Sequence, residues 1–173
     1  MNRLLPLAFA AAAFCAAPPA FAQSIDALVA AEQQVAAAWD ATPLTFRKTL
    51  FATGIEAYGV YTEKQGSVFA PGEPIVVYAE PVGYGYTTDA AGKYTFGFDF
   101  DLVVKTADGD VVAGKDGFAH FALVSTVQNR EFLVSLTLTL NEAPAGNYVL
   151  EYLARDIASD ETATITMPFT IAE

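Results

Sequence analysis

The sequence predicts an all-β fold, an antiparallel β-sandwich preceded by one helix, and three observations lead to this prediction. From Lys93 to Lys105, apolar or aromatic side chains alternate with polar ones, and Val103 is the only exception on the polar side. A second segment, from Phe132 to Leu140, alternates almost without a break, and a period of two is that of a β-strand. Turn residues separate about seven or eight such segments, which is typical of two antiparallel sheets packed face to face.

Length and composition predict one folded domain. The chain has 173 residues, of which 53% are hydrophobic and 17% charged, so it can bury a full core and is not disordered throughout. The net charge of -11 makes nucleic acid an unsuitable partner, because no basic stripe is present to neutralise phosphates. An anionic membrane surface is disfavoured for the same reason.

Residues 1–22 have the features of a secretory signal peptide. Arg3 supplies the positive start, the apolar run Leu4–Ala17 is too short to span a membrane as a helix, and Ala20-Phe21-Ala22 is a small-x-small cleavage site. The alanine-rich style is typical of bacteria. We therefore expect a periplasmic or secreted protein with no membrane span after cleavage.

Cys15 is the only cysteine and lies inside this segment. An acylated lipoprotein cysteine is the alternative interpretation, although a bulky residue, Phe14, precedes it. Once the signal peptide is removed, the chain has no disulfide, no thiolate nucleophile and no cysteine-based metal site. The mature domain must therefore be stabilised by core packing.

Residues 23–44 are expected to contain the only helix. Ser24 is a suitable N-cap, Asp26 places a negative charge in the first turn, and Thr42-Pro43 ends the helix. Helical spacing is followed by Ile25, Leu28, Val29, Val35, Ala36 and Trp39. We expect this amphipathic helix to pack on the domain, and the alternative is a helix that binds a partner or dimerises.

Residues 45–173 are expected to form the sandwich. The predicted strands are 46–52, 75–80, 93–105, 111–112, 118–127, 132–140, 148–154 and 163–171, and 56–67 is predicted as a loop or an edge strand. Asp108-Gly109 predicts a hairpin, and the residues Gly114–Gly117 predict a turn. Pro168 cannot donate to a ladder, so the last strand is predicted to lie at an edge or to contain a bulge.

Two short stretches resemble parts of immunoglobulin-like domains. Residues 69–75, FAPGEPI, resemble the Phe/Tyr-x-Pro-Gly-Glu start of the second strand in many such domains, including macroglobulin-type modules. Residues 144–150, PAGNYVL, followed by Asp156, are similar to the penultimate strand of bacterial immunoglobulin-like and fibronectin-type modules, with Ala145 inserted between proline and glycine.

This resemblance implies an immunoglobulin-like β-sandwich over residues 46–172. It also implies a tyrosine corner at Tyr148, in which the hydroxyl bonds to the backbone upstream. The cysteine pair of antibody domains is absent. The motifs bear on the fold and say almost nothing about function.

No catalytic constellation is evident, so we predict a protein that is not an enzyme and has no cofactor. His120 is the only histidine, and no nucleophile motif accompanies it, so we expect it to be a packed or surface residue. Asp99 and Asp101 share a strand face and could serve a hydrolase, which is the weaker alternative.

The same carboxylates are weak calcium candidates. Asp99 and Asp101 are followed by Asp108 and Asp110 in the next turn, and Ca²⁺ takes oxygen ligands. The spacing differs from that of an EF-hand, because Val103 stands where a polar residue is required. A solvated polar face is the simpler interpretation, and we predict no metal site.

Four tyrosines are the candidate ligand-binding residues. Tyr84 and Tyr86 flank glycines near a strand end, as do Tyr58 and Tyr61 earlier in the chain. Exposed rings at the rim of a sandwich could stack on a sugar or hold a peptide. The simpler interpretation is that they extend the core or cover a sheet edge.

Together these features favour a secreted, non-catalytic interaction module that binds a protein or a cell-envelope component. A small-ligand or carbohydrate-binding module using the four tyrosines is the alternative. The two hypotheses differ in whether the rings are exposed.

Overall fold

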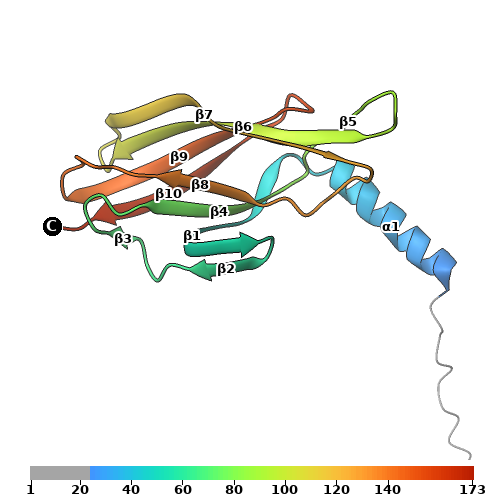
Figure 1. The fold of residues 1–173 in the computed structure, drawn as a ribbon, viewed down its shortest axis with the longest axis horizontal. Coiled ribbons are helices and arrows are strands. Elements are labelled where there is room, and N and C mark those ends of the chain that lie inside the picture. Colours follow the sequence, from blue (N-terminus) through green and yellow to red (C-terminus); the bar gives the residue numbers. More distant parts are fainter. Residues whose placement is uncertain (1–23) are drawn as a thin grey trace, which may run out of the picture.

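The structure is a computed structural model that describes residues 24–173, so the predicted signal peptide and Cys15 lie outside the described residues. One helix, α1 (Ile25–Asp40), precedes ten strands in this range. The strands form two mostly antiparallel sheets that face each other (Figure 1), which confirms an all-β sandwich with one N-terminal helix.

The first sheet is fully antiparallel. Its order is β2 (Val60–Glu63), β1 (Thr45–Ala57), β4 (Ile75–Val82) and β8 (Val134–Leu138). The end of β1 and the whole of β2 lie in segment 56–67, which the sequence predicted as a loop or an edge strand, and β2 does lie at the edge.

The second sheet is larger. Its order is β3 (Val68–Phe69), β10 (Thr162–Ile171), β9 (Gly146–Asp156) and β6 (Tyr94–Thr106), and both β5 (Thr87–Thr88) and β7 (Val111–Ser125) pair with β6. Only β3 and β10 run parallel. Pro168 lies on β10, which pairs with β3 only at its last two residues, so the predicted edge position agrees with the structure.

The sequence prediction of two separate strands, 111–112 and 118–127, is wrong, because the structure has the single strand β7 there. The chain does not turn at Gly114–Gly117. Instead, β7 continues through a bulge opposite β6, where Gly117 adopts a φ of +58° and donates its amide to a carboxylate oxygen of Asp101 at 2.7 Å. Glycine tolerates this conformation without steric cost, so the residue that suggested a turn makes a bulge.

The aromatic face of β6 is the centre of the core, as the alternation predicted. Phe96, Phe98 and Phe100 are completely buried. The covering layer includes Val77 of β4 and Phe132, whose ring meets that of Phe98 edge-on at 5.2 Å. An edge-to-face contact of this kind adds roughly 1 kcal/mol to the burial of the two rings.

Tyr148 forms the hydrogen bond that the resemblance implied. Its hydroxyl donates to the carbonyl of Pro144, four residues upstream, at 2.8 Å. The ring stacks on Phe169 with centroids 5.5 Å apart. The bond ties the loop before β9 to the strand itself.

Candidate functional site

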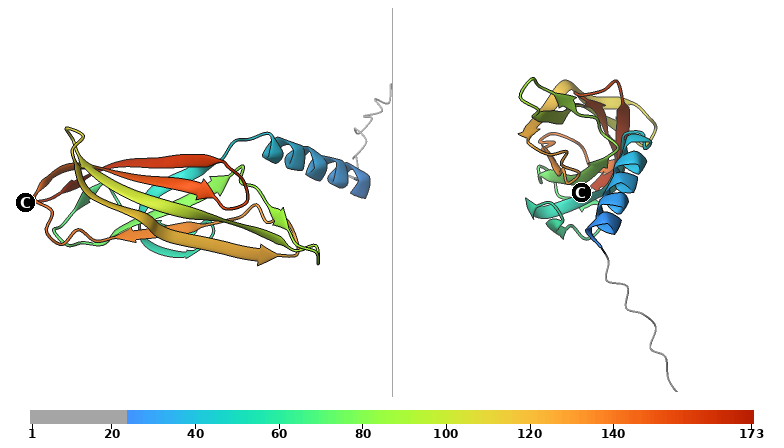
Figure 2. Two further views of the ribbon diagram at one scale, coloured as in Figure 1. Left: turned by 90° about the horizontal axis from the view of Figure 1, so that it is seen from above. Right: turned by 90° about the vertical axis from the view of Figure 1, so that its right-hand side faces the viewer.

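The most distinctive surface of the molecule is the helix α1, which projects from one end of the sandwich (Figures 1 and 2). Ser24 caps its first turn, because the Ser24 hydroxyl accepts the amide of Ala27 at 3.2 Å. Only one residue of the helix, Trp39, is buried. The expectation that the helix packs on the domain is therefore wrong for all but its last turn.

The apolar side chains of α1 face solvent. The exposed fractions are 69% for Ile25, 54% for Leu28, 43% for Val29 and 54% for Val35. Three carboxylates lie on the helix, at Asp26, Glu32 and Asp40, and the helix has no lysine or arginine. We call the four exposed aliphatic residues the apolar face of α1.

Trp39 attaches the helix to the sandwich. Its indole N–H donates to the carbonyl of Tyr84 at 2.9 Å, and its ring meets that of Tyr84 edge-on at 4.9 Å. The guanidinium of Arg130 lies 5.8 Å from the centre of the indole. An aromatic ring, a hydrogen bond and a cation therefore meet where Trp39 contacts the domain.

A close approach of two backbone segments sets the direction of the helix. Gly83 follows β4 with a φ of +76°, and a Cβ at this position would lie 2.6 Å from the carbonyl oxygen of Pro43. Any side chain at Gly83 would displace the segment between α1 and β1. The buried carboxylate of Asp156 holds the same loop, because it accepts the amide of Gly85 at 2.6 Å.

Tyr84 and Tyr86 lie beneath this junction, and their environment corrects the idea of an exposed aromatic rim. Tyr84 is only 1% exposed, and Tyr86 is half-buried. Both hydroxyls donate to the carbonyl of Asn129 at 2.7 Å, and burial raises the pKa of both phenols. Tyr84 also stacks on Phe96, so it belongs to the core.

A hollow of about 360 Å³ remains between the helix end and this loop. It is lined by Trp39, Asp40, Thr42, Gly83, Tyr84, Gly85, Tyr86, Gln128, Ser159 and Glu161. The side chains of Trp39 and Tyr84 are almost fully covered, so Tyr86, which is half-buried, offers the largest accessible aromatic surface there.

Tyr58 and Tyr61 lie elsewhere, on the β1–β2 hairpin, so the four candidate tyrosines do not form one site. The hydroxyl of Tyr61 accepts a hydrogen bond of 2.7 Å from the ammonium of Lys48, and the hydroxyl of Tyr58 accepts one of 3.2 Å from the guanidinium of Arg47. The ring of Tyr61 packs on Tyr78 at 4.5 Å, and burial raises the pKa of Tyr78 to about 12. These contacts attach the hairpin to the outer face of the first sheet.

The four carboxylates that were weak calcium candidates do not form one site either. Asp101 is paired with the guanidinium of Arg155, whose side-chain hydrogen bond lowers the carboxyl pKa to about 2. Asp99 contacts the ring of His120 at 2.7 Å. Asp108 and Asp110 lie in the β6–β7 hairpin, and residues 24–173 contain no group of three or more carboxylate, histidine or cysteine side chains suited to a metal.

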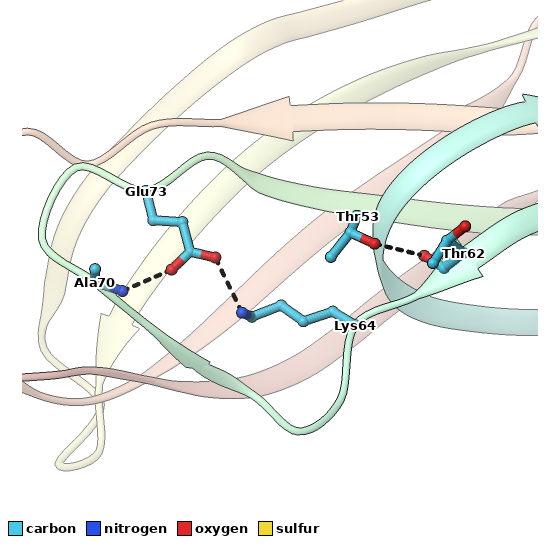
Figure 3. Close-up of polar contacts among 5 residues, drawn as sticks. All are labelled: Thr53, Thr62, Lys64, Ala70 and Glu73. Atoms are coloured by element: carbon cyan, nitrogen blue, oxygen red, sulfur yellow. Dashed lines mark hydrogen bonds and ion pairs between the residues drawn. The ribbon is translucent and has the colours of Figure 1, made fainter.

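The FAPGEPI motif lies at the end of the sandwich away from α1 (Figure 1), and its polar contacts have a structural role there (Figure 3). One carboxylate oxygen of Glu73 accepts the amide of Ala70 at 2.8 Å, and the other accepts the ammonium of Lys64 at 3.0 Å. The hydrogen bond from the Ala70 amide is the main cause that lowers the pKa of the Glu73 carboxyl, and the hydrogen bond from Lys64 lowers it further. Glu73 thereby closes the turn before β4.

Compared with models of known protein families and with curated proteins, the chain matches none. In the part of the chain that the structure describes, no helix has both the length and the apolar character needed to cross a membrane. The arrangement that remains as a candidate site is an exposed apolar helix, attached at one end to a rigid sandwich.

Proposed function

We propose that the protein is a secreted, non-catalytic interaction module that binds a protein or a cell-envelope component through the apolar face of α1. The observation that carries this proposal is the exposure of Ile25, Leu28, Val29 and Val35 on a helix whose only buried residue is Trp39. A helix docked in a groove is a common mode of protein recognition, and it uses apolar residues at positions i, i+3, i+4 and i+7. Ile25, Leu28 and Val29 follow the first three of these positions, and Glu32 stands at the fourth.

Binding would also stabilise the helix itself. An isolated helix shorter than about 12–15 residues is marginal in water, even when it is rich in alanine, and α1 with 16 residues is only just longer. A partner that covers the exposed half of each aliphatic side chain contributes about 1 kcal/mol per residue, or about 4 kcal/mol for the apolar face. Such a gain is enough to shift a marginal helix towards its ordered form.

The proposed cellular location and the proposed fold type support the same function. The predicted signal peptide argues for export to the periplasm or beyond. The sandwich is of the immunoglobulin-like type, in our proposal, because β1, β4 and β8 face β6, β7, β9 and β10 and because Tyr148 bonds back to Pro144. Sandwiches of this type host many binding functions, so the fold alone does not identify the partner.

A pair of photo-crosslinking variants tests the proposal in cells. A photoreactive residue replaces Leu28 in one variant and Ala30 in the other. Both positions are exposed, but two residues along a helix correspond to about 200°, so they lie on opposite faces. We expect a discrete adduct with a partner from position 28 and none from position 30. Equal labelling from both positions, or no adduct from position 28, would contradict the proposal.

A small-ligand or carbohydrate-binding module is the second candidate, and the hollow of about 360 Å³ beside Tyr86 favours it. A glycan array with the wild-type protein, compared with Tyr86→Ala, tests this function. Specific hits that disappear in the variant would support the second candidate. An array without hits would remove carbohydrate binding.

A further inference from the structure

A second surface, separate from α1, lies along the outer edge of β7. This strand pairs with β6 on one side, and no strand of residues 24–173 pairs with its other side. From Ala119 to Ser125 its register with β6 has no irregularity. Alternate residues of an edge strand direct their N–H and C=O groups outward, so this stretch presents a regular row of donors and acceptors.

The stretch from Ala119 to Ser125 lacks the features that usually protect an edge. It contains no lysine, proline or carboxylate, and its one titratable residue, His120, contacts Asp99. The other half of β7 differs, because the bulge and the charges of Lys115 and Asp116 interrupt it. Only the second half of the strand is therefore suited to pairing.

A mostly apolar slot lies beside this stretch. It has a volume of about 290 Å³, and it separates β7 from the segment that precedes β8. Its lining consists of His120, Phe121, Ala122, Leu123, Phe132 and Leu133. The volume lies just below the range of pockets for drug-sized ligands, which suits a side chain better than a free small molecule.

Large apolar side chains at the same edge are exposed. Leu123 on β7 is 47% exposed, and its neighbour Val124 is 63% exposed. Leu123 opposes Phe96 in the register, so it lies on the core side of the sheet and borders the slot. These side chains would become buried only if another segment of polypeptide covered this edge.

We propose that residues 119–125 of β7 bind an extended segment of another polypeptide as an added strand, with one apolar side chain of that segment in the slot. Only an extended backbone satisfies a row of alternating donors and acceptors, and a pocket beside the edge selects the side chain. Because the stretch has no lysine, arginine or carboxylate, the segment that it selects is uncharged and apolar at alternate positions.

A second copy of the chain is a poorer occupant than an unrelated segment. Each copy carries a net charge of -11, so two copies repel each other at low ionic strength. The bulge and the charged residues next to it also restrict how far two β7 strands could pair with each other. Formation of a dimer is therefore an outcome of the test that counts against the proposal.

The test selects peptides on the full mature protein. A phage library of random twelve-residue peptides is panned against the wild type, against Leu123→Lys and against Val111→Lys. Leu123→Lys places a charge at the slot, whereas Val111→Lys places the same charge on the same strand beyond the bulge, at a side chain that is 64% exposed. Circular dichroism first establishes that both variants fold.

The proposal predicts peptides with alternating apolar residues that bind the wild type and Val111→Lys. Their affinity for Leu123→Lys should be at least tenfold lower, and hydrogen exchange of the amides in 119–125 should slow when a synthetic copy of an enriched peptide binds. The proposal is overturned if no peptide is enriched or if Leu123→Lys binds the enriched peptides as tightly as the wild type does. It is also overturned if the peptide slows hydrogen exchange in another part of the protein, such as α1, and not in 119–125. A dimer that protects these amides without peptide also overturns it, since the occupant would then be a second copy.

Discussion

Replacing Trp39 with alanine removes the side chain that attaches α1 to the sandwich. The indole is 8% exposed, packs edge-on against Tyr84 and donates a hydrogen bond of 2.9 Å to the Tyr84 carbonyl. Loss of a buried ring of this size costs about 3–5 kcal/mol of the free energy of unfolding, and the hydrogen bond accounts for about 1 kcal/mol of that. Trp39→Phe keeps a ring but removes the N–H, so its cost should be about 1–2 kcal/mol.

Urea unfolding followed by circular dichroism measures both variants. With a slope of about 2 kcal/mol per molar urea, the alanine variant should lower the midpoint by about 2 M and the phenylalanine variant by less than 1 M. Hydrogen exchange of α1 should also accelerate in the alanine variant, because no other residue of the helix is buried. A midpoint shift below about 0.5 M for Trp39→Ala would refute the packing of this ring on the domain.

Three further predictions concern the sandwich. Tyr148→Phe removes the hydroxyl that bonds to the backbone at 2.8 Å, and should cost about 1 kcal/mol in urea unfolding with an unchanged slope. Asp101 has a folded pKa of about 2, below its ordinary 3.8, so its ion pair stabilises the protein above about pH 4 and is lost as the pH falls towards 2. Asp101→Asn should remove that part of the acid dependence of the melting temperature, and an unchanged acid profile would count against the pairing. Gly97→Ala places a Cβ on the carbonyl oxygen of Phe121 and should cost roughly 1–3 kcal/mol, whereas Gly114→Ala on β7 meets no atom closer than 3.5 Å and should change stability by less than about 0.5 kcal/mol.

The strands with the clearest alternation were predicted well, because parity along a strand is a local property. The aromatic wall of β6 is buried as the spacing of Phe96, Phe98 and Phe100 requires. β7 was predicted less well, because Gly117 has the same preference for positive φ in a turn and in a bulge, and only the partner strand distinguishes the two.

The candidate site was predicted only in its parts. Helical spacing identified the apolar residues of α1, but the same spacing describes a packed helix and an exposed one. The tyrosines near glycines were predicted as one set of ligand-binding residues, but Tyr84 is a core residue and Tyr58 belongs to a different surface. Partners such as Arg155 for Asp101 lie 54 positions away in the chain, so no local pattern could reveal them.

The sequence by itself determined that this protein is a sandwich of strands after one helix, since side-chain alternation, capping and turn residues act over a few positions. Only the tertiary structure decided that the helix points away from the sandwich and leaves its apolar face in solvent. That direction depends on contacts between distant segments, chiefly Trp39 with Tyr84 and Pro43 with Gly83. Such contacts exist only once the sheets have formed, because the backbone path that brings these residues together is a property of the whole fold.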